Sequence, residues 1–171
     1  LDQLIEFTET LEANKWLSVD LETTSINPML AEIVGFSFSL KKDTGFYIPI
    51  EFKDKEENLF GNNDLEEVIR ILKPFLEDKN IPKTGQNIKY DALILKRFGI
   101  ELQGIEFDTM IAAHLLNPNA RSYKLDNLSL SYLNYKMVPI KDLIGTGKNQ
   151  ITMDQVTLED LSLIHISEPT R

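Results

Sequence analysis

The chain has 171 residues, of which 42% are hydrophobic and 26% are charged, a composition that fits one globular domain with its own core. Cysteine is absent, which excludes a disulfide framework and a thiolate metal site. No apolar run approaches the ~20 residues that cross a bilayer, and no secretory leader pattern is present. The sequence therefore predicts a cytoplasmic protein with no membrane contact, and we expect a monomer.

The formal net charge of −9 argues at first against a nucleic-acid partner, because proteins that hold phosphates usually carry a basic surface. An enzyme that hydrolyses phosphodiesters with bound divalent cations is a different case, since it needs clustered carboxylates whose charge the cations offset. The charge then indicates that a neighbouring domain supplies most of the affinity for long DNA.

Three segments in the first fifty residues have the alternating polarity of strands. They are short and separated by turns, which is typical of an antiparallel meander. The segments are residues 16–23, 33–40 and 45–50.

The following residues have mainly the 3.6-residue periodicity of helices, with one short apolar run between them. Strands followed by helices mixed with strands predict an α/β layered domain. The expected elements are a helix over 65–76 capped by Asp64, a strand over 81–85, a helix over 88–98 ended by Gly99, a helix from Asp108 through Leu116, and a helix over 125–133.

Asp20 and Glu22 form the first candidate site. Two residues apart on a strand, they share one face with Cα atoms ~6.6 Å apart, and they lie near the strand end where α/β sheets often place ligands. The same pair is also compatible with two solvated acids on the polar face of a strand. D-x-E alone does not decide between these interpretations.

The second candidate site is the segment G-Q-N-I-K-Y-D, residues 85–91, where a strand leads into a helix. Asn87 is expected to be the N-cap, and Tyr90 and Asp91 follow it at spacings of three and four, so the three side chains can converge. An acid in the first turn also complements the helix dipole without any further role.

Taken together, the two segments resemble known motifs. V-D-L-E-T-T-S-I-N-P, with the following V-G-F-S-F-S and Y-I-P-I, is similar to the first exonuclease motif of family A DNA polymerases of the DNA polymerase I type. G-Q-N-I-K-Y-D resembles their second motif, and F-G-I-E-L-Q-G-I-E-F-D-T-M, L-D-N-L and G-T-G-K-N-Q-I-T follow the same layout. The resemblance runs from about residue 4 to residue 160 and is to the proofreading 3′–5′ exonuclease domain. It implies a ribonuclease H-like mixed sheet, an antiparallel meander plus parallel strands, flanked by helices.

The resemblance also implies a site and its ligands. Asp20, Glu22 and Asp91 would be catalytic and would hold two divalent cations, Mg²⁺ or Mn²⁺. The partners implied are the 3′ end of single-stranded DNA and a C-terminal polymerase domain in the parent chain. The residues expected to contact substrate are Thr23, Ile26, Gln86, Asn87 and Tyr90.

The third motif of that family is a tyrosine followed four residues later by an aspartate. Counted without gaps, these positions hold Ile164 and Glu168. Residues 161–171 resemble translated sequencing adaptor, so the exonuclease domain is expected to span 1–160, to be incomplete at both ends, and to be truncated at its C-terminal helix. We therefore expect this chain to be impaired relative to its parent.

Two alternatives stay open. A ribonuclease D-type 3′–5′ exoribonuclease would share both acidic motifs, although G-T-G-K-N-Q-I-T fits the polymerase family better. A catalytically inactive domain that serves as a nucleic-acid-binding scaffold is the other, against which the presence of Asp20, Glu22 and Asp91 weighs for the parent.

Overall fold

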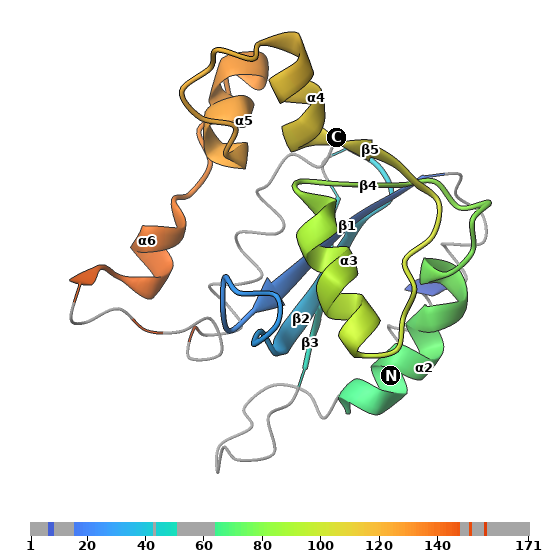
Figure 1. Cartoon of the computed structure of the whole chain (residues 1–171). Coiled ribbons are helices and arrows are strands. Elements are labelled where there is room, and N and C mark those ends of the chain that lie inside the picture. The colour runs from blue at the N-terminus through green and yellow to red at the C-terminus, as the bar shows by residue number, and fades with distance from the viewer. Residues whose placement is uncertain are drawn as a thin grey trace.

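The computed structural model describes residues 7–8, 16–42, 44–50, 64–147, 151 and 156, and its elements follow the predicted order closely (Figure 1). The adaptor-like tail, residues 161–171, lies outside the described residues. The elements are β1 (Leu17–Thr23), β2 (Ile33–Ser39), β3 (Phe46–Pro49), α2 (Leu65–Leu76), β4 (Lys83–Gly85), α3 (Ile88–Arg97), β5 (Ile105–Asp108), α4 (Thr109–Leu116), α5 (Leu125–Leu133) and α6 (Ile140–Ile144).

The sheet is mixed, with strand order β3-β2-β1-β4-β5. The pairs β1/β2 and β2/β3 are antiparallel, as the meander predicts, whereas β1/β4 and β4/β5 are parallel. Strand β5 was not predicted. Its apolar residues Ile105 and Phe107 are 43% and 46% exposed, so this edge strand lacks the alternation that identifies a half-buried strand.

The core fills the space between the sheet and the two helices α2 and α3, which lie on the same face of it (Figure 1). Strand β1 contributes Leu17, Val19 and Leu21 to this core, and β2 contributes Phe36 and Phe38, the partners of Leu21 and Val19. The buried members include Leu17, Val19, Leu21, Phe36, Phe38, Val68, Leu72, Leu76, Ile88, Ile94 and Leu95.

Helix α2 begins as predicted. The Asp64 side chain accepts a hydrogen bond from the backbone N–H of Glu66 at 3.0 Å, which satisfies one of the free donors at the helix start. Helix α3 ends before Gly99, which has φ of 82°, also as predicted. Within the described residues, no helix has both the length and the apolar character needed to cross a membrane.

Candidate active site

The polar face of β1 carries the first pair of predicted site residues. Asp20 and Glu22 point away from the α2/α3 core, and their partners on β2 are Ser37 and Gly35. Asp20 lines a cleft of about 190 Å³ between this face of the sheet and helices α4 and α5. The prediction that the two acids share one face is therefore confirmed.

Tyr47, on β3, lies over Gly35 and was missed by the sequence analysis. A Cβ atom at Gly35 would lie 2.3 Å from the Tyr47 hydroxyl oxygen, so a larger residue there would displace the tyrosine. Burial raises the pKa of the Tyr47 phenol, and the negative charge of Glu22 adds to the rise. Tyr47 is therefore a neutral hydroxyl close to Glu22.

Asp91, in the first turn of α3, is only 2% exposed. Burial raises the pKa of its carboxyl to about 7, and the negative charges of Glu22 and Asp108 add to the rise, while hydrogen bonds from the backbone of Asp91 and Leu21 oppose it. Leu21 lies between Asp20 and Glu22 in the chain, so Asp91 approaches β1 next to both acids. Its Oδ1 is buried and has no hydrogen-bond partner in the part of the chain that the structure describes.

Across the described ranges, no three His, Asp or Glu side chains lie close enough to hold one metal ion. The structure brings Glu22 and Asp91 near each other and places Asp20 on the same strand face as Glu22. A buried carboxylate oxygen without a donor, beside a second carboxylate, is a site that a cation would stabilise. Oxygen ligands of this kind suit Mg²⁺ or Mn²⁺, and the three-residue metal set stays a prediction.

Tyr90 connects α3 to the end of β1. Its hydroxyl lies 2.8 Å from the hydroxyl of Thr23 and donates a hydrogen bond to the carbonyl of Ser25. Two predicted substrate contacts, Thr23 and Tyr90, are thus in direct contact. Ile26 follows Ser25 and is 98% exposed, so it stands apart from them at the surface.

Asn87 occupies the N-cap position of α3, as the sequence predicts, but its side chain does not cap the helix. Its backbone is left-handed, with φ of 57° and ψ of 40°, and its side chain makes no capping hydrogen bond. The Asp108 carboxylate takes that role, accepting from the backbone N–H groups of Asn87 and Ile88 at 3.2 and 2.9 Å. It also accepts from Met110 and Ile111 of α4 at 2.8 and 3.1 Å, so one carboxylate caps two helices.

Gln86, directly after β4, is held by Thr109 at the start of α4 and by Tyr123, which precedes α5. Its side-chain nitrogen donates to the carbonyl of Tyr123 at 2.8 Å, and its side-chain oxygen accepts from the Thr109 hydroxyl. Gln86 also lines the cleft that Asp20 lines. The sequence identified Asp108 only as the cap of its own helix, and it gave no signal for Thr109. The contact of Asp108 with the start of α3 and the contact of Thr109 with Gln86 both depend on β5 lying next to β4.

The comparisons with known proteins agree with this arrangement. The model of a family described as 3′–5′ exonuclease matches residues 1–158. The chain belongs to this 3′–5′ exonuclease family. DNA polymerase I of Pseudomonas aeruginosa is 36% identical to it over 153 residues, which is 87% of this chain and 16% of that protein. The predicted resemblance and enzyme class are confirmed at the level of the family, and the chain spans only about 16% of the length of this curated relative.

Similar solved structures confirm the fold predicted for this chain. Escherichia coli RNase D, an exoribonuclease involved in structured RNA processing, superposes with a TM-score of 0.66 at 17% identity, covering 97% of this chain and 39% of that one. Brucella melitensis NrnC with bound Mg²⁺ gives a TM-score of 0.62 at 18% identity, over 90% of this chain and 66% of that one. At these identities the likeness shows the ribonuclease H-like fold alone.

Proposed function

We propose that the chain is the proofreading exonuclease part of a DNA polymerase and that it acts on the 3′ end of single-stranded DNA with two divalent cations, Mg²⁺ or Mn²⁺. The observation that carries the proposal is the position of Asp91. A buried carboxyl oxygen without a hydrogen-bond donor lies beside the strand that carries Asp20 and Glu22, inside a member of the 3′–5′ exonuclease family. Such an arrangement costs stability unless a cation binds there.

The three acids would divide the ligand roles. Asp20 would contact both ions, Glu22 the ion next to the attacking water, and Asp91 the ion next to the departing oxygen. Bound divalent cations make water a stronger nucleophile and stabilise negative charge on the oxygens of an in-line displacement. Tyr47, neutral and close to Glu22, supports this side of the site by packing over Gly35.

The substrate would be a flexible strand and not a duplex. Thr23 and Tyr90 fix the end of β1, Gln86 lines the cleft, and Ile26 offers an exposed apolar contact for the terminal base. The backbone at Asn87 would border the same path. With a net charge of −9, the chain binds DNA weakly by itself, so a C-terminal polymerase domain in the parent protein would deliver the strand to this monomeric unit.

We further propose that this chain is a weak nuclease. The positions at which the family has a water-orienting tyrosine and a fourth carboxylate hold Ile164 and Glu168, and both lie outside the described residues. An isoleucine has no hydroxyl to position water. Degradation of single-stranded DNA at the rate of the parent enzyme would contradict this proposal.

Calorimetric titration with Mn²⁺ tests the site directly. The chain should bind Mn²⁺, and binding should fall at least tenfold, which is about 1.4 kcal/mol, in the Asp20→Ala and Asp91→Asn variants. Asp126→Ala removes an exposed acid on α5 and is the matched control, which should bind as the wild type does. Equal binding by all four proteins would show that the acids are ordinary surface charge.

The preference for DNA or RNA as substrate distinguishes the two catalytic hypotheses. The competing hypothesis is ribonuclease D-type activity on RNA, because RNase D shares the fold of this chain. We expect 5′-labelled DNA to be shortened from its 3′ end faster than RNA of the same sequence, at high enzyme concentration and with Mn²⁺. Faster loss of RNA would favour the exoribonuclease, and Mn²⁺ binding without any hydrolysis would favour a scaffold.

A further inference from the structure

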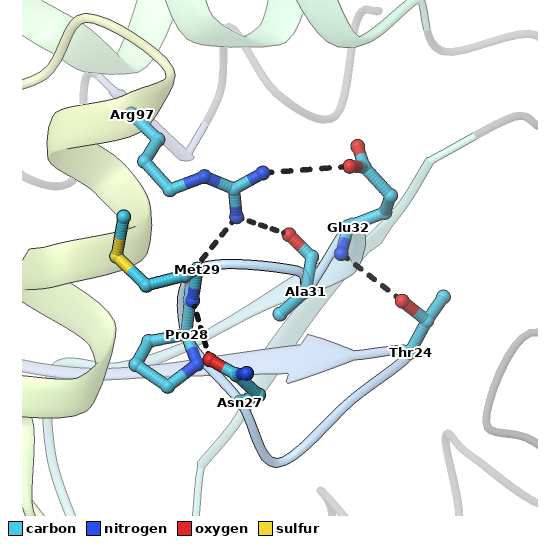
Figure 2. Close-up of polar contacts among 7 residues, drawn as sticks. All are labelled: Thr24, Asn27, Pro28, Met29, Ala31, Glu32 and Arg97. Carbon is cyan, nitrogen blue, oxygen red and sulfur yellow. Dashed lines mark hydrogen bonds and ion pairs between the residues drawn. The ribbon is translucent and has the colours of Figure 1, made fainter.

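The loop between β1 and β2, residues 24–32, is attached to α3 by an arginine. Arg97 is the last residue of α3, and its Nη1 donates to the carbonyl oxygens of Pro28 and Ala31 at 2.8 and 2.6 Å (Figure 2). Its Nη2 lies 3.6 Å from a carboxylate oxygen of Glu32. The planar guanidinium presents several N–H donors in one rigid fork, so a single side chain holds three points of the loop.

The loop is also organised internally. The Thr24 hydroxyl accepts from the backbone N–H of Glu32, and the Asn27 side chain accepts from that of Met29, both at 3.0 Å (Figure 2). The N–H groups of Leu30 and Ala31 both donate to the carbonyl of Asn27 at 3.0 Å. Residues 24–32 therefore form a compact turn that α3 can hold as one unit.

Helix α3 holds this turn at both of its ends. Tyr90 contacts Ser25 at the start of the loop, and Arg97 contacts Pro28 and Ala31 near its end. Tyr90 and Arg97 are seven residues apart, which places them about two turns apart on one face of the helix. The same helix carries Asp91, so the loop and the carboxylate are fixed relative to each other.

Ile26 lies between these two attachments and is 98% exposed. Met29 and Leu30 of the same turn are 64% and 69% exposed, so Ile26 is the most exposed of three apolar side chains that the turn presents together. A group of exposed apolar side chains on an ordered turn is positioned for an apolar partner. We infer that Arg97 is a positioning residue that holds the 24–32 loop so that Ile26 contacts the base of the 3′-terminal nucleotide. The inference rests on the exonuclease function proposed above.

The test compares two probes in the presence of Mn²⁺, thymidine 5′-monophosphate and deoxyribose 5-phosphate, which lacks the base. In the full chain, Arg97→Gln should weaken binding of thymidine 5′-monophosphate about fivefold and leave binding of deoxyribose 5-phosphate and of Mn²⁺ unchanged, because only the apolar contact is lost. Ile26→Ser should have the same effect, and the double variant should lose no more than either single variant.

Two further variants separate positioning from charge. Arg97→Lys keeps the positive charge but cannot bridge the same three acceptors, so it should behave like Arg97→Gln. Arg70→Gln removes an exposed arginine that pairs with Glu67 on α2 and should bind both probes as the wild type does. Recovery of wild-type affinity by lysine, or equal loss for both probes, would overturn the inference.

Hydrogen exchange tests the clamp without a ligand. Arg97→Gln should accelerate exchange of the Leu30 and Ala31 amides and leave α2 unchanged, and unchanged protection of those amides would overturn the inference. Failure of the wild-type chain to bind Mn²⁺ would count against the proposed function, and the exchange result would then decide on the clamp alone.

Discussion

Two buried carboxylates lie near each other in this protein, and their surroundings differ. Asp108, which is 9% exposed, accepts hydrogen bonds from four backbone N–H groups at the starts of α3 and α4. Asp91, which is 2% exposed, has one oxygen with no partner among the described residues, and the charges of Glu22 and Asp108 add to the rise that burial causes in its pKa. Asp108 is saturated with hydrogen-bond donors, whereas Asp91 keeps the free acceptor capacity that the proposed metal ligand needs.

The largest expected effect is the loss of Asp108. Asp108→Ala should lower the free energy of unfolding by about 2–4 kcal/mol, since four N–H groups at two helix starts lose a charged acceptor. Asp64→Ala, which removes an exposed cap with one hydrogen bond, should cost about 1 kcal/mol. Urea denaturation measures both, and equal losses would show that the shared cap is no stronger than a local one.

Asp91→Asn should change the free energy of unfolding in the opposite direction from Asp108→Ala. In the absence of divalent cations, the buried charge destabilises the folded chain, so neutralising it should raise the free energy of unfolding by about 1–2 kcal/mol at pH 8. Denaturation in a chelating buffer gives the value. A loss of stability on this substitution would mean that the carboxylate is a structural group like Asp108.

The same comparison predicts a pH dependence for the wild-type chain. The pKa of Asp91 in the folded chain is about 7, above the ~4 of an exposed aspartate, so the folded state binds more protons between these values. The free energy of unfolding should therefore decrease as the pH rises from about 4 to about 7, and this component should vanish in Asp91→Asn. Persistence of the same slope in the variant would assign it to other groups.

Most of the fold could be predicted because its strands and helices follow from local patterns of polar and apolar residues. The alternation of residues 16–23 and 33–40 and the periodicity of residues 65–76 and 88–98 identified strands and helices nearly to their ends. Strand β5 escaped prediction because it is short and exposes its apolar side chains at the sheet edge.

The site was less readable than the fold. The shared face of Asp20 and Glu22 follows from strand geometry, but the position of Asp91 beside them was expected only from the resemblance to the exonuclease family. Arg97 contacts residues more than 60 positions earlier, and Asp108 caps a helix that begins 20 residues before it. Such contacts form only after the sheet has assembled, so no local sequence pattern predicts them.

The smallest expected changes in the free energy of unfolding come from substitutions at the N-cap positions Asn87 of α3 and Asp64 of α2. Asn87 has a left-handed backbone, which glycine and asparagine tolerate and serine adopts at a cost. Asn87→Gly should therefore change the free energy of unfolding by less than about 0.5 kcal/mol, whereas Asn87→Ser should lower it by about 0.5–1 kcal/mol. At Asp64, whose backbone is extended and whose side chain does cap, Asp64→Ser should be nearly neutral because serine is a good N-cap. If Asn87→Ser is instead neutral, the Asn87 side chain caps α3 in solution, and Asp108 is not the residue that fixes the helix carrying Asp91.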